Sequence, residues 1–416
     1  MRLERLSCTL ADAAEAAARV RAMVPAAGSV EAAVREILEA VRTGGDRAVA
    51  GYERRFGGSE PGPLRVAPEE LAAALDGLEA AVREGLEMAI ANVAAVAAAG
   101  AGAAVELALE QGQRIRLREV PVRRAAIYAP GGRAPYPSSV VMGAVTARAA
   151  GVEEVVVAAP PHPLILGAAA LCGADAVYRM SGAQAVAALA YGTDSVAPVD
   201  VIVGPGNLYV QEAKRQLSGQ VGIDGFAGPS DLVVILSEGA DPAWVALDLL
   251  AQAEHGDDSL VVAVSDSAAL LDAVAAAMTP RPTVADGPKV LLHAESPDAA
   301  LGFAEALAPE HLQLAGAAAE ALAPRVRRAG CLFVGANSGT AFGDYVAGSN
   351  HTLPTGGSAR FASGLSPHHF RRRMAEVRVG AAATALAGAG AAVARAEGFE
   401  VHAESMEARM GENRPR

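Results

Sequence analysis

The stretch Val201-Ile-Val-Gly-Pro-Gly-Asn207 decides the fold class, because a short apolar run ends there in a glycine turn. Similar apolar runs precede it at 125–129, 155–158 and 176–178, with predicted helices between them at 140–150, 164–173 and 182–191. Such an alternation is typical of buried parallel strands joined by crossover helices. The sequence therefore predicts a parallel α/β unit in this region.

A second alternation follows the first. It comprises predicted strands at 232–236, 260–264, 289–292 and 331–334, with predicted helices at 242–255, 267–278 and 297–307. Apolar spacing predicts helix through the first hundred residues and again over 368–396, with Arg371–Arg373 on a solvated helix face. Residues 340–366 combine Gly, Ser and Thr with charged groups, which favours a long functional loop.

Composition narrows the class of protein. The 416 residues are 52% hydrophobic and carry a net charge of −12 without a long basic run, which argues against disorder and against a nucleic-acid partner. Much of the apolar content is alanine, so 88–109 is interpreted as a core helix and no membrane partner is expected. Three dispersed cysteines and an N-terminus without an apolar centre favour a cytoplasmic protein with neither disulfides nor a thiolate zinc site.

Three polar turns are expected at the carboxyl ends of the first set of strands. They begin at Tyr128, at Ser181 and at Gly204. The turn at Ser181 leads into Gln184, and the turn at Gly204 leads into Asn207. Open parallel sheets bind ligands at this edge, although no turn here carries a full G-x-G-x-x-G pattern. Ordinary strand-to-helix turns and a cofactor cleft both remain open on these residues alone.

The predicted helix 242–255 carries a polar stripe. Asp241-Pro242 is a typical helix start, and Asp248, Gln252 and His255 share one face near the other end. A lone histidine at a helix end is adequately explained by the helix dipole. Three polar residues on an otherwise apolar helix instead suggest the wall of a site.

Ala308-Pro-Glu-His-Leu-Gln-Leu314 is predicted to open a helix, with Glu310 and His311 in its first turn. The positive end of the helix dipole would keep the His311 imidazole neutral, as a general base requires. A surface pair at a helix start explains the same residues equally well.

Four further polar residues complete the candidate set. Asp344 and His351 lie in the glycine-rich loop, and Glu397 and His402 lie near the C-terminus. Gln252, His255, Asp344 and His402 would form a nitrogen and oxygen donor set suited to zinc. Because these four residues are far apart in the sequence, their spacing does not define the geometry of a metal site. The residues alone therefore indicate a metal-dependent α/β enzyme, without a more specific function.

The chain closely resembles histidinol dehydrogenases over residues 30 to 409. The resemblance is carried by Tyr128-Ala-Pro-Gly-Gly132, Tyr136-Pro-Ser-Ser139, Ser181-Gly-Ala-Gln184, Gly204-Pro-Gly-Asn207, Ala227-Gly-Pro-Ser230, Asp248-Leu-Leu-Ala-Gln-Ala-Glu-His255, Ala308-Pro-Glu-His-Leu-Gln-Leu314 and Gly348-Ser-Asn-His-Thr-Leu-Pro-Thr355. It implies oxidation of L-histidinol through L-histidinal to L-histidine, the last step of histidine biosynthesis, with two NAD+ and zinc.

The resemblance also implies residue roles. Zinc would be held by Gln252, His255, Asp344 and His402, and would orient the substrate. His311 matches the base for the hydroxyl proton, and Glu310 matches the residue that with it activates water. Cofactor contacts match Tyr128, Gln184 and Asn207, and substrate contacts match Ser230, Gln252, His255, His311, Asp344, His351, Glu397 and His402.

The expected architecture is α/β, with two Rossmann-like domains of incomplete dinucleotide fold. An N-terminal helical arm would span 1–25, the catalytic and zinc domain 26–122 and 233–378, and the NAD-binding domain 123–232. A swapped helical tail, 379–416, would form a homodimer in which the partner's tail completes each active site.

Two departures from the family pattern stand out, Asp231 where Glu is usual and Thr352 where Val is usual. Both keep polarity or size. One alternative function is that of a zinc- and NAD-dependent enzyme of this fold that oxidises another small alcohol, such as a sulfonated diol. Glu397 argues against this substrate, because its carboxylate would repel a sulfonate. The second alternative is a catalytically silent metal-binding protein, and the presence of both Glu310 and His311 argues against it.

Overall fold

A computed structural model describes residues 3–24, 28–57, 62–131, 134–226, 228–279, 281 and 284–410. The chain divides into two units, of which the first comprises Met1–Gly100 and Val122–Phe370 and the second comprises Ala101–Pro121 and Arg371–Arg416. The first unit holds two parallel sheets with their helices, which confirms the predicted α/β class. No described helix combines the length and the apolar character needed to cross a bilayer.

One sheet of the first unit has five parallel strands within the described residues. They are β4 (Arg124–Tyr128), β5 (Glu154–Ala159), β6 (Ala176–Arg179), β7 (Val201–Val203) and β8 (Gly222–Ile223). Their order is β6-β5-β4-β7-β8, so the chain reverses its direction of winding between β4 and β7. The carboxyl ends of these two strands therefore lie at a topological switch point, where open α/β sheets bind ligands.

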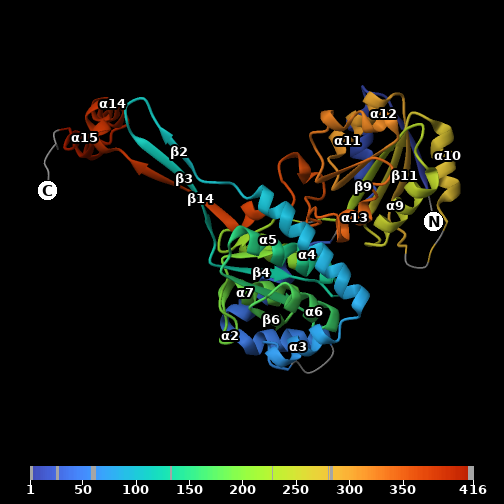
Figure 1. The fold of residues 1–416 in the computed structure, drawn as a ribbon, viewed down its shortest axis with the longest axis horizontal. Coiled ribbons are helices and arrows are strands. Elements are labelled where there is room, and N and C mark those ends of the chain that lie inside the picture. The colour runs from blue at the N-terminus through green and yellow to red at the C-terminus, as the bar shows by residue number, and fades with distance from the viewer. Residues whose placement is uncertain are drawn as a thin grey trace. The chain divides into compact units, whose positions relative to one another are not determined.

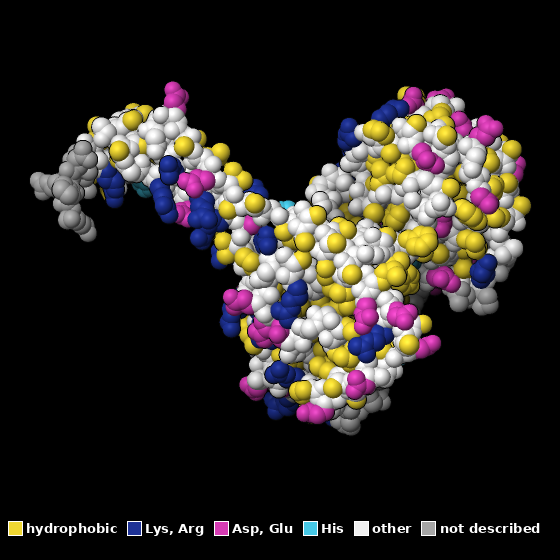
Figure 2. Space-filling view, viewed as in Figure 1, with side chains coloured by type: hydrophobic (Ala, Val, Ile, Leu, Met, Phe, Trp, Pro, Cys, Tyr) yellow, Lys and Arg dark blue, Asp and Glu magenta, His cyan; other side chains and the backbone are white. Residues whose placement is uncertain are grey.

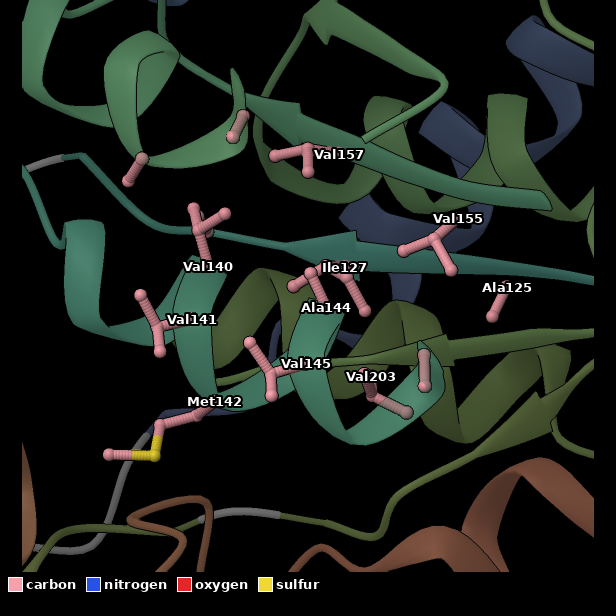
Figure 3. Close-up of a cluster of buried hydrophobic side chains, with 14 of the residues drawn as sticks. Ala125, Ile127, Val140, Val141, Met142, Ala144, Val145, Val155, Val157 and Val203 are labelled. Atoms are coloured by element: carbon pink, nitrogen blue, oxygen red, sulfur yellow. The ribbon is translucent and has the colours of Figure 1, made fainter. Parts of the chain in front are cut away.

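Helices cover both faces of this sheet (Figure 1). They are α2 (Glu31–Gly57), α3 (Pro68–Asp76), α4 (Ala80–Gly100), α5 (Pro137–Ala150), α6 (Pro163–Leu171), α7 (Gly182–Tyr191) and α8 (Leu208–Leu217). Figure 3 shows Val140, Ala144 and Val145 of α5 beside Ile127 and other strand residues. These side chains are fully or nearly fully buried, because each apolar strand residue is covered by a helix.

The other sheet has six parallel strands in the described part of the chain. They are β1 (Glu4–Cys8), β9 (Asp231–Leu236), β10 (Leu260–Ser265), β11 (Lys289–Ala294), β12 (His311–Ala315) and β13 (Cys331–Val334). Their order is β1-β11-β10-β9-β12-β13, with a second reversal between β9 and β12. The remaining elements of this part of the unit are α1 (Ala13–Arg21), α9 (Pro242–Ala253), α10 (Ala268–Ala277), α11 (Pro297–Leu307), α12 (Ala317–Glu320) and α13 (Thr340–Tyr345), with 3-10 turns at Ala323–Arg325, Ser358–Arg360 and Pro367–Phe370.

Helix α9 begins as predicted. The Asp241 side chain accepts a hydrogen bond from the Ala243 amide at 2.8 Å, and Pro242 occupies the first helical position. The helix ends at Ala253, so Gln252 lies in its last turn and His255 lies just beyond it.

Several predicted elements are wrong. The N-terminal segment contains strand β1, which pairs with β11, before helix α1 begins. The predicted loop 340–366 contains helix α13. The helix predicted through the first hundred residues is also interrupted between α3 and α4, at residues 77–79.

The packing of residues 31–100 differs from the predicted domain grouping, in which 26–122 joined 233–378. Helix α2 packs Val34, Ile37 and Leu38 against the five-stranded sheet, and α4 packs on α5 of the same layer. Segment 4–21, by contrast, belongs to the six-stranded sheet. The hydrophobic faces of these helices therefore assign them to the sheet that their side chains cover.

The second unit has a three-stranded antiparallel sheet, ordered β14-β3-β2, and a helical pair in its described residues. Its elements are β2 (Val105–Ala108), β3 (Arg114–Pro121), β14 (Arg371–Arg378), a 3-10 turn at Gly380–Ala382, α14 (Ala383–Ala396) and α15 (Glu400–Glu407). The predicted helix over 368–396 is thus wrong in its first part, and Arg371–Arg373 lie on a strand paired with β3. Within the described part of 379–416, the expected helical character is confirmed by α14 and α15.

Charged side chains of the two signs are interspersed over the face drawn in Figure 2. In the second unit, Arg373 pairs with Glu119 at 2.6 Å and Arg395 pairs with Glu407 at the same distance. These arginines are therefore matched locally by carboxylates.

Candidate active site

A cavity of about 1680 Å³ lies within the first unit and is lined by loops from both of its sheets. Its lining includes the candidate residues Tyr128, Gln184, Asn207, Ser230, His255, Glu310, His311, Asp344 and His351. The fold thus brings together residues that are spread over more than two hundred positions in the sequence.

The three predicted turns meet on the side formed by the five-stranded sheet. The Tyr128 hydroxyl at the end of β4 accepts a hydrogen bond of 3.0 Å from the Gly182 amide, at the start of α7. The Asn207 side chain caps α8 by accepting hydrogen bonds from the amides of Tyr209 and Val210. The turns at Ser181 and Gly204 therefore lead into helices and share one cavity wall with Tyr128, and their role in binding a cofactor stays a prediction.

Glu53 of α2 is a cavity residue that the sequence analysis missed. Its Oε1 accepts hydrogen bonds from the Ser181 amide at 2.8 Å and from Gln184 Nε2 at 2.9 Å. Burial raises the pKa of this carboxyl. Glu53 thus fixes the Gln184 carboxamide and places a negative charge beside the three turns, and no local motif signals this role.

A buried ion pair supports the glycine turn after β7. Lys214 Nζ lies 2.7 Å from Asp224 Oδ1 and also donates to the Gly204 carbonyl. Asp224 Oδ2 in turn accepts the Gly204 amide at 2.7 Å. Gly204 has φ of 120°, and a Cβ added there would lie 2.1 Å from the Tyr128 carbonyl oxygen. Only glycine suits this position, because both the conformation and the close approach exclude a side chain.

The reactive pair lies at the amino ends of strands in the six-stranded sheet. His311 is the first residue of β12, and Glu310 immediately precedes it. The predicted helix start at 308–314 is therefore wrong, as is the argument that a helix dipole keeps His311 neutral. The segment pairs with β9 on one side and β13 on the other, and these long-range pairings outweigh the local helix-start signal.

The Glu310 carboxylate is buried and is held by its neighbours across the sheet. Oε2 accepts hydrogen bonds from the Ser230 hydroxyl and, at 3.1 Å, from the Asp231 amide. Burial raises the pKa of this carboxyl to about 7. A carboxyl with a pKa near neutrality can act as a proton acceptor at physiological pH.

His311 lies between two carboxylates. Its Nδ1 is 3.8 Å from Glu310 Oε2, and its Nε2 is 3.7 Å from Asp344 Oδ1. Burial by itself lowers the pKa of the imidazole, but Glu310 and Asp344 raise it more, to about 9. The surroundings therefore favour the charged imidazolium rather than the neutral form expected from the sequence.

Gln252 and His255 extend this cluster from the end of α9. Gln252 Nε2 donates to Ser230 Oγ at 2.5 Å, whereas its Oε1 is buried and accepts no hydrogen bond from the described residues. His255 Nδ1 lies 3.1 Å from the Gln252 carbonyl oxygen, and this contact orients the imidazole ring. The third member of the predicted stripe, Asp248, instead accepts a hydrogen bond from Gln313.

Asp344 and His351 come from α13 and the segment after it. His351 Nδ1 lies 2.9 Å from the Asp344 carbonyl oxygen, and burial lowers the pKa of this imidazole. Burial disfavours a charged Asp344, yet hydrogen bonding and charge from His311, together with His351 and His255, lower the pKa of its carboxyl. Asp344 is thus an ionised carboxylate surrounded by histidines.

These donors fit a divalent cation such as zinc. The orphaned Gln252 oxygen, the His255 imidazole and the Asp344 carboxylate are the required ligand types. Among the residues that the structure describes, no three His, Cys, Asp or Glu side chains are close enough to hold a metal ion together. The other predicted ligand, His402, belongs to α15 of the second unit, and Glu397 lies between α14 and α15.

Comparisons with known proteins agree on one family. A family model described as histidinol dehydrogenase matches residues 21–410. Histidinol dehydrogenase from Aromatoleum aromaticum is 43% identical over 92% of this chain and 91% of its own length, and that from Rhodospirillum rubrum is 42% identical over 98% of both. The crystal structure of histidinol dehydrogenase from Elizabethkingia anophelis has a TM-score of 0.91 at 28% identity and covers 99% of each chain. This chain belongs to the histidinol dehydrogenase family.

Proposed function

We propose that this protein oxidises L-histidinol through L-histidinal to L-histidine, the last step of histidine biosynthesis. The observation that carries the proposal is the buried Glu310 and His311 pair, which shares one cavity with three glycine-rich or polar turns at the carboxyl ends of parallel strands. When bound, NAD+ accepts a hydride in each half-reaction and zinc orients the substrate imidazole and amine.

His311 serves as the base in the first half-reaction. It takes the hydroxyl proton of the alcohol while the C–H hydride departs, which leaves the aldehyde. To act in this way, His311 must begin neutral. Asp344 is one of the groups that raise the pKa of His311. Asp344 would hold the divalent cation, whose charge would offset that of the carboxylate and so favour the neutral imidazole.

Glu310 serves in the second half-reaction. As the water oxygen bonds to the aldehyde carbon, the Glu310 carboxylate takes one water proton and the imidazolium of His311 gives a proton to the aldehyde oxygen. As the hydride leaves the hydrate, His311, which is neutral again, takes a hydroxyl proton, and the product is the carboxylic acid. The separation of 3.8 Å between Glu310 Oε2 and His311 Nδ1 lets each group stabilise the charge formed on the other.

The remaining roles follow the donor chemistry and the family resemblance. Gln252, His255, Asp344 and His402 would hold zinc, and Tyr128, Gln184 and Asn207 would contact NAD+. Substrate contacts are assigned to Ser230, Gln252, His255, His311, Asp344, His351, Glu397 and His402. We assign the NAD-binding part to 123–232, the catalytic part chiefly to 233–378, and the role of dimerisation to the tail 379–416, which would complete the site of a second copy. The protein would act in the cytoplasm.

The central test is stoichiometric. Purified protein loaded with zinc should form two NADH for each histidinol consumed, and His311→Asn should abolish most NADH formation. A ratio of one would limit the enzyme to the alcohol step. Turnover of a sulfonated diol without turnover of histidinol would assign a different substrate, and unchanged activity of His311→Asn would overturn its role as base.

A mixing experiment tests the shared site. His402→Ala and His311→Asn proteins should each be inactive, and a mixture that exchanges subunits should regain activity through hybrid dimers with one intact site. Exchange shown by differently tagged subunits without recovered activity would contradict completion by the partner.

A further inference from the structure

An arginine from the N-terminal helix reaches the turn that carries Glu310. Arg21, the last residue of α1, places Nη1 2.5 Å from Asp231 Oδ2 and donates from Nη2 to the Leu307 carbonyl oxygen at 2.6 Å. Leu307 ends helix α11, and only two residues separate it from Glu310. The guanidinium therefore binds one side of the turn directly.

Asp231 connects Arg21 to the other side of that turn. Its Oδ1 accepts the Glu310 amide at 2.6 Å, while its own amide donates to Glu310 Oε2 at 3.1 Å. These reciprocal hydrogen bonds fix both the backbone and the carboxylate of Glu310. Arg21 and Asp231 thus hold the turn from Leu307 to Glu310 at both ends.

The turn requires such support. Ala308 has φ of 49° and is the only described residue other than glycine with a positive φ. A side chain disfavours this left-handed conformation, which persists where surrounding contacts impose it. The Arg21 contacts are of that kind, because they bind the residue before Ala308 and the carboxylate that holds Glu310.

Charge makes Arg21 more than a structural brace. Asp231 is 1% exposed and Glu310 is 6% exposed, so two carboxylates lie side by side in a buried setting. The charge of Asp231 adds to the raised pKa of Glu310. The Arg21 guanidinium compensates Asp231, so that the neighbouring Glu310 can ionise at a lower cost.

We propose that Arg21 is a positioning residue that acts through Asp231 to hold the Glu310 side chain in place. This inference rests on the proposed function, because it assigns Arg21 to the water-activating half of the reaction. Asp231, which differs from the Glu usual in the family, then serves as the link between Arg21 and Glu310.

The inference predicts a selective defect. Histidinal can be oxidised with NAD+ to histidine, which requires activated water, or reduced with NADH to histidinol, which does not. Arg21→Met should lower the rate of oxidation roughly tenfold or more, because the group that activates water loses the contacts that position it. The rate of reduction should match that of the Arg5→Met control, which removes an exposed ion pair with Asp272 from the same N-terminal segment.

Conservative and compensating variants separate charge from folding. Arg21→Lys retains a cation and should restore most of the oxidation rate. Asp231→Asn keeps an acceptor for the Glu310 amide without a charge, so the double variant Arg21→Met with Asp231→Asn should oxidise histidinal faster than Arg21→Met alone. The double variant also leaves no unpaired buried charge, so it keeps the test available where the single variant fails to fold.

The outcomes distinguish two failures. The role of Arg21 is overturned if Arg21→Met and the double variant each lose oxidation and reduction equally. It is also overturned if neither rate falls. Glu310→Gln is the reference, because it should abolish oxidation and spare reduction. If Glu310→Gln leaves the balance of the two rates unchanged, the proposed role of Glu310 itself is overturned.

Discussion

Replacing Lys214 by Met tests whether the buried ion pair under the glycine turn organises the cofactor side of the cavity. Lys214 and Asp224 have side chains that are 1% and 8% exposed, and their charged atoms lie 2.7 Å apart. The substitution leaves a buried Asp224 carboxylate without its cation and the Gly204 carbonyl without its donor. Breaking a buried pair in this way costs about 3–5 kcal/mol, a large part of the roughly 5–15 kcal/mol that stabilises a typical folded protein.

The change should be visible in both stability and kinetics. At roughly 2 °C per kcal/mol for a large chain, Tm should fall by about 6–10 °C. The KM for NAD+ should rise more than the KM for histidinol, because Gly204 and Asn207 line the cavity on the side of the five-stranded sheet. Thermal unfolding followed by circular dichroism and steady-state NADH formation measure the two effects.

Two further variants make the reasoning refutable. Lys214→Met with Asp224→Asn removes both charges and retains an acceptor for the Gly204 amide, so it should regain stability relative to the single variant. Lys289→Met is the matched control, since that buried lysine donates to the carbonyls of Ala285 and Gly287 and should affect stability without a selective rise in the KM for NAD+. A single variant as stable as the parent, or a double variant less stable than the single one, would refute the argument.

Three other expectations follow from the cavity. Gln252→Leu should lower the zinc content measured by elemental analysis. The metal-free protein should lose only the hydrogen bond to Ser230, about 1 kcal/mol of stability. Unchanged zinc content would contradict the role of Gln252 as a ligand. Burial raises the pKa of Glu310 to about 7, so its carboxylate takes up a proton as the pH falls through that value. Oxidation of histidinal should therefore slow over this pH range. If the same loss of rate at low pH persists in Glu310→Gln, another group causes it. Glu53→Gln should raise the KM for NAD+ and increase the kcat/KM for NADP+ relative to NAD+. The substitution removes a negative charge beside Gln184 that repels the added phosphate of NADP+. An unchanged cofactor preference would show that Glu53 does not discriminate between the two cofactors.

The alternation of short apolar runs and helices was sufficient to predict two parallel α/β units. The strand ends at Tyr128, Ser181 and Gly204 could likewise be placed at one edge, because the rule for open parallel sheets depends only on strand direction. Capping by Asp241 was also predictable, since it involves an amide only two residues away. Each of these features is signalled by a short local pattern of residues in the chain.

Strand pairing decided the elements that local patterns misassigned. The segment 308–314 has proline and glutamate as a helix start would, but β12 lies between β9 and β13. Residues 371–378 were assigned to a helix, but they pair with 114–121, more than two hundred residues earlier. Neither partner is visible in a local window, and pairing energies exceed local propensities.

The sequence by itself determined the class of fold, the polar residues available for chemistry and the turns on the cofactor side. Only the tertiary structure decided that the reactive pair lies at the amino ends of β9 and β12, and that Arg21, 210 residues from Asp231, contributes to it. It also decided the protonation tendencies of Glu310 and His311. The physical reason is that burial and the charges of distant neighbours set these properties, and neither is encoded in the residues adjacent along the chain.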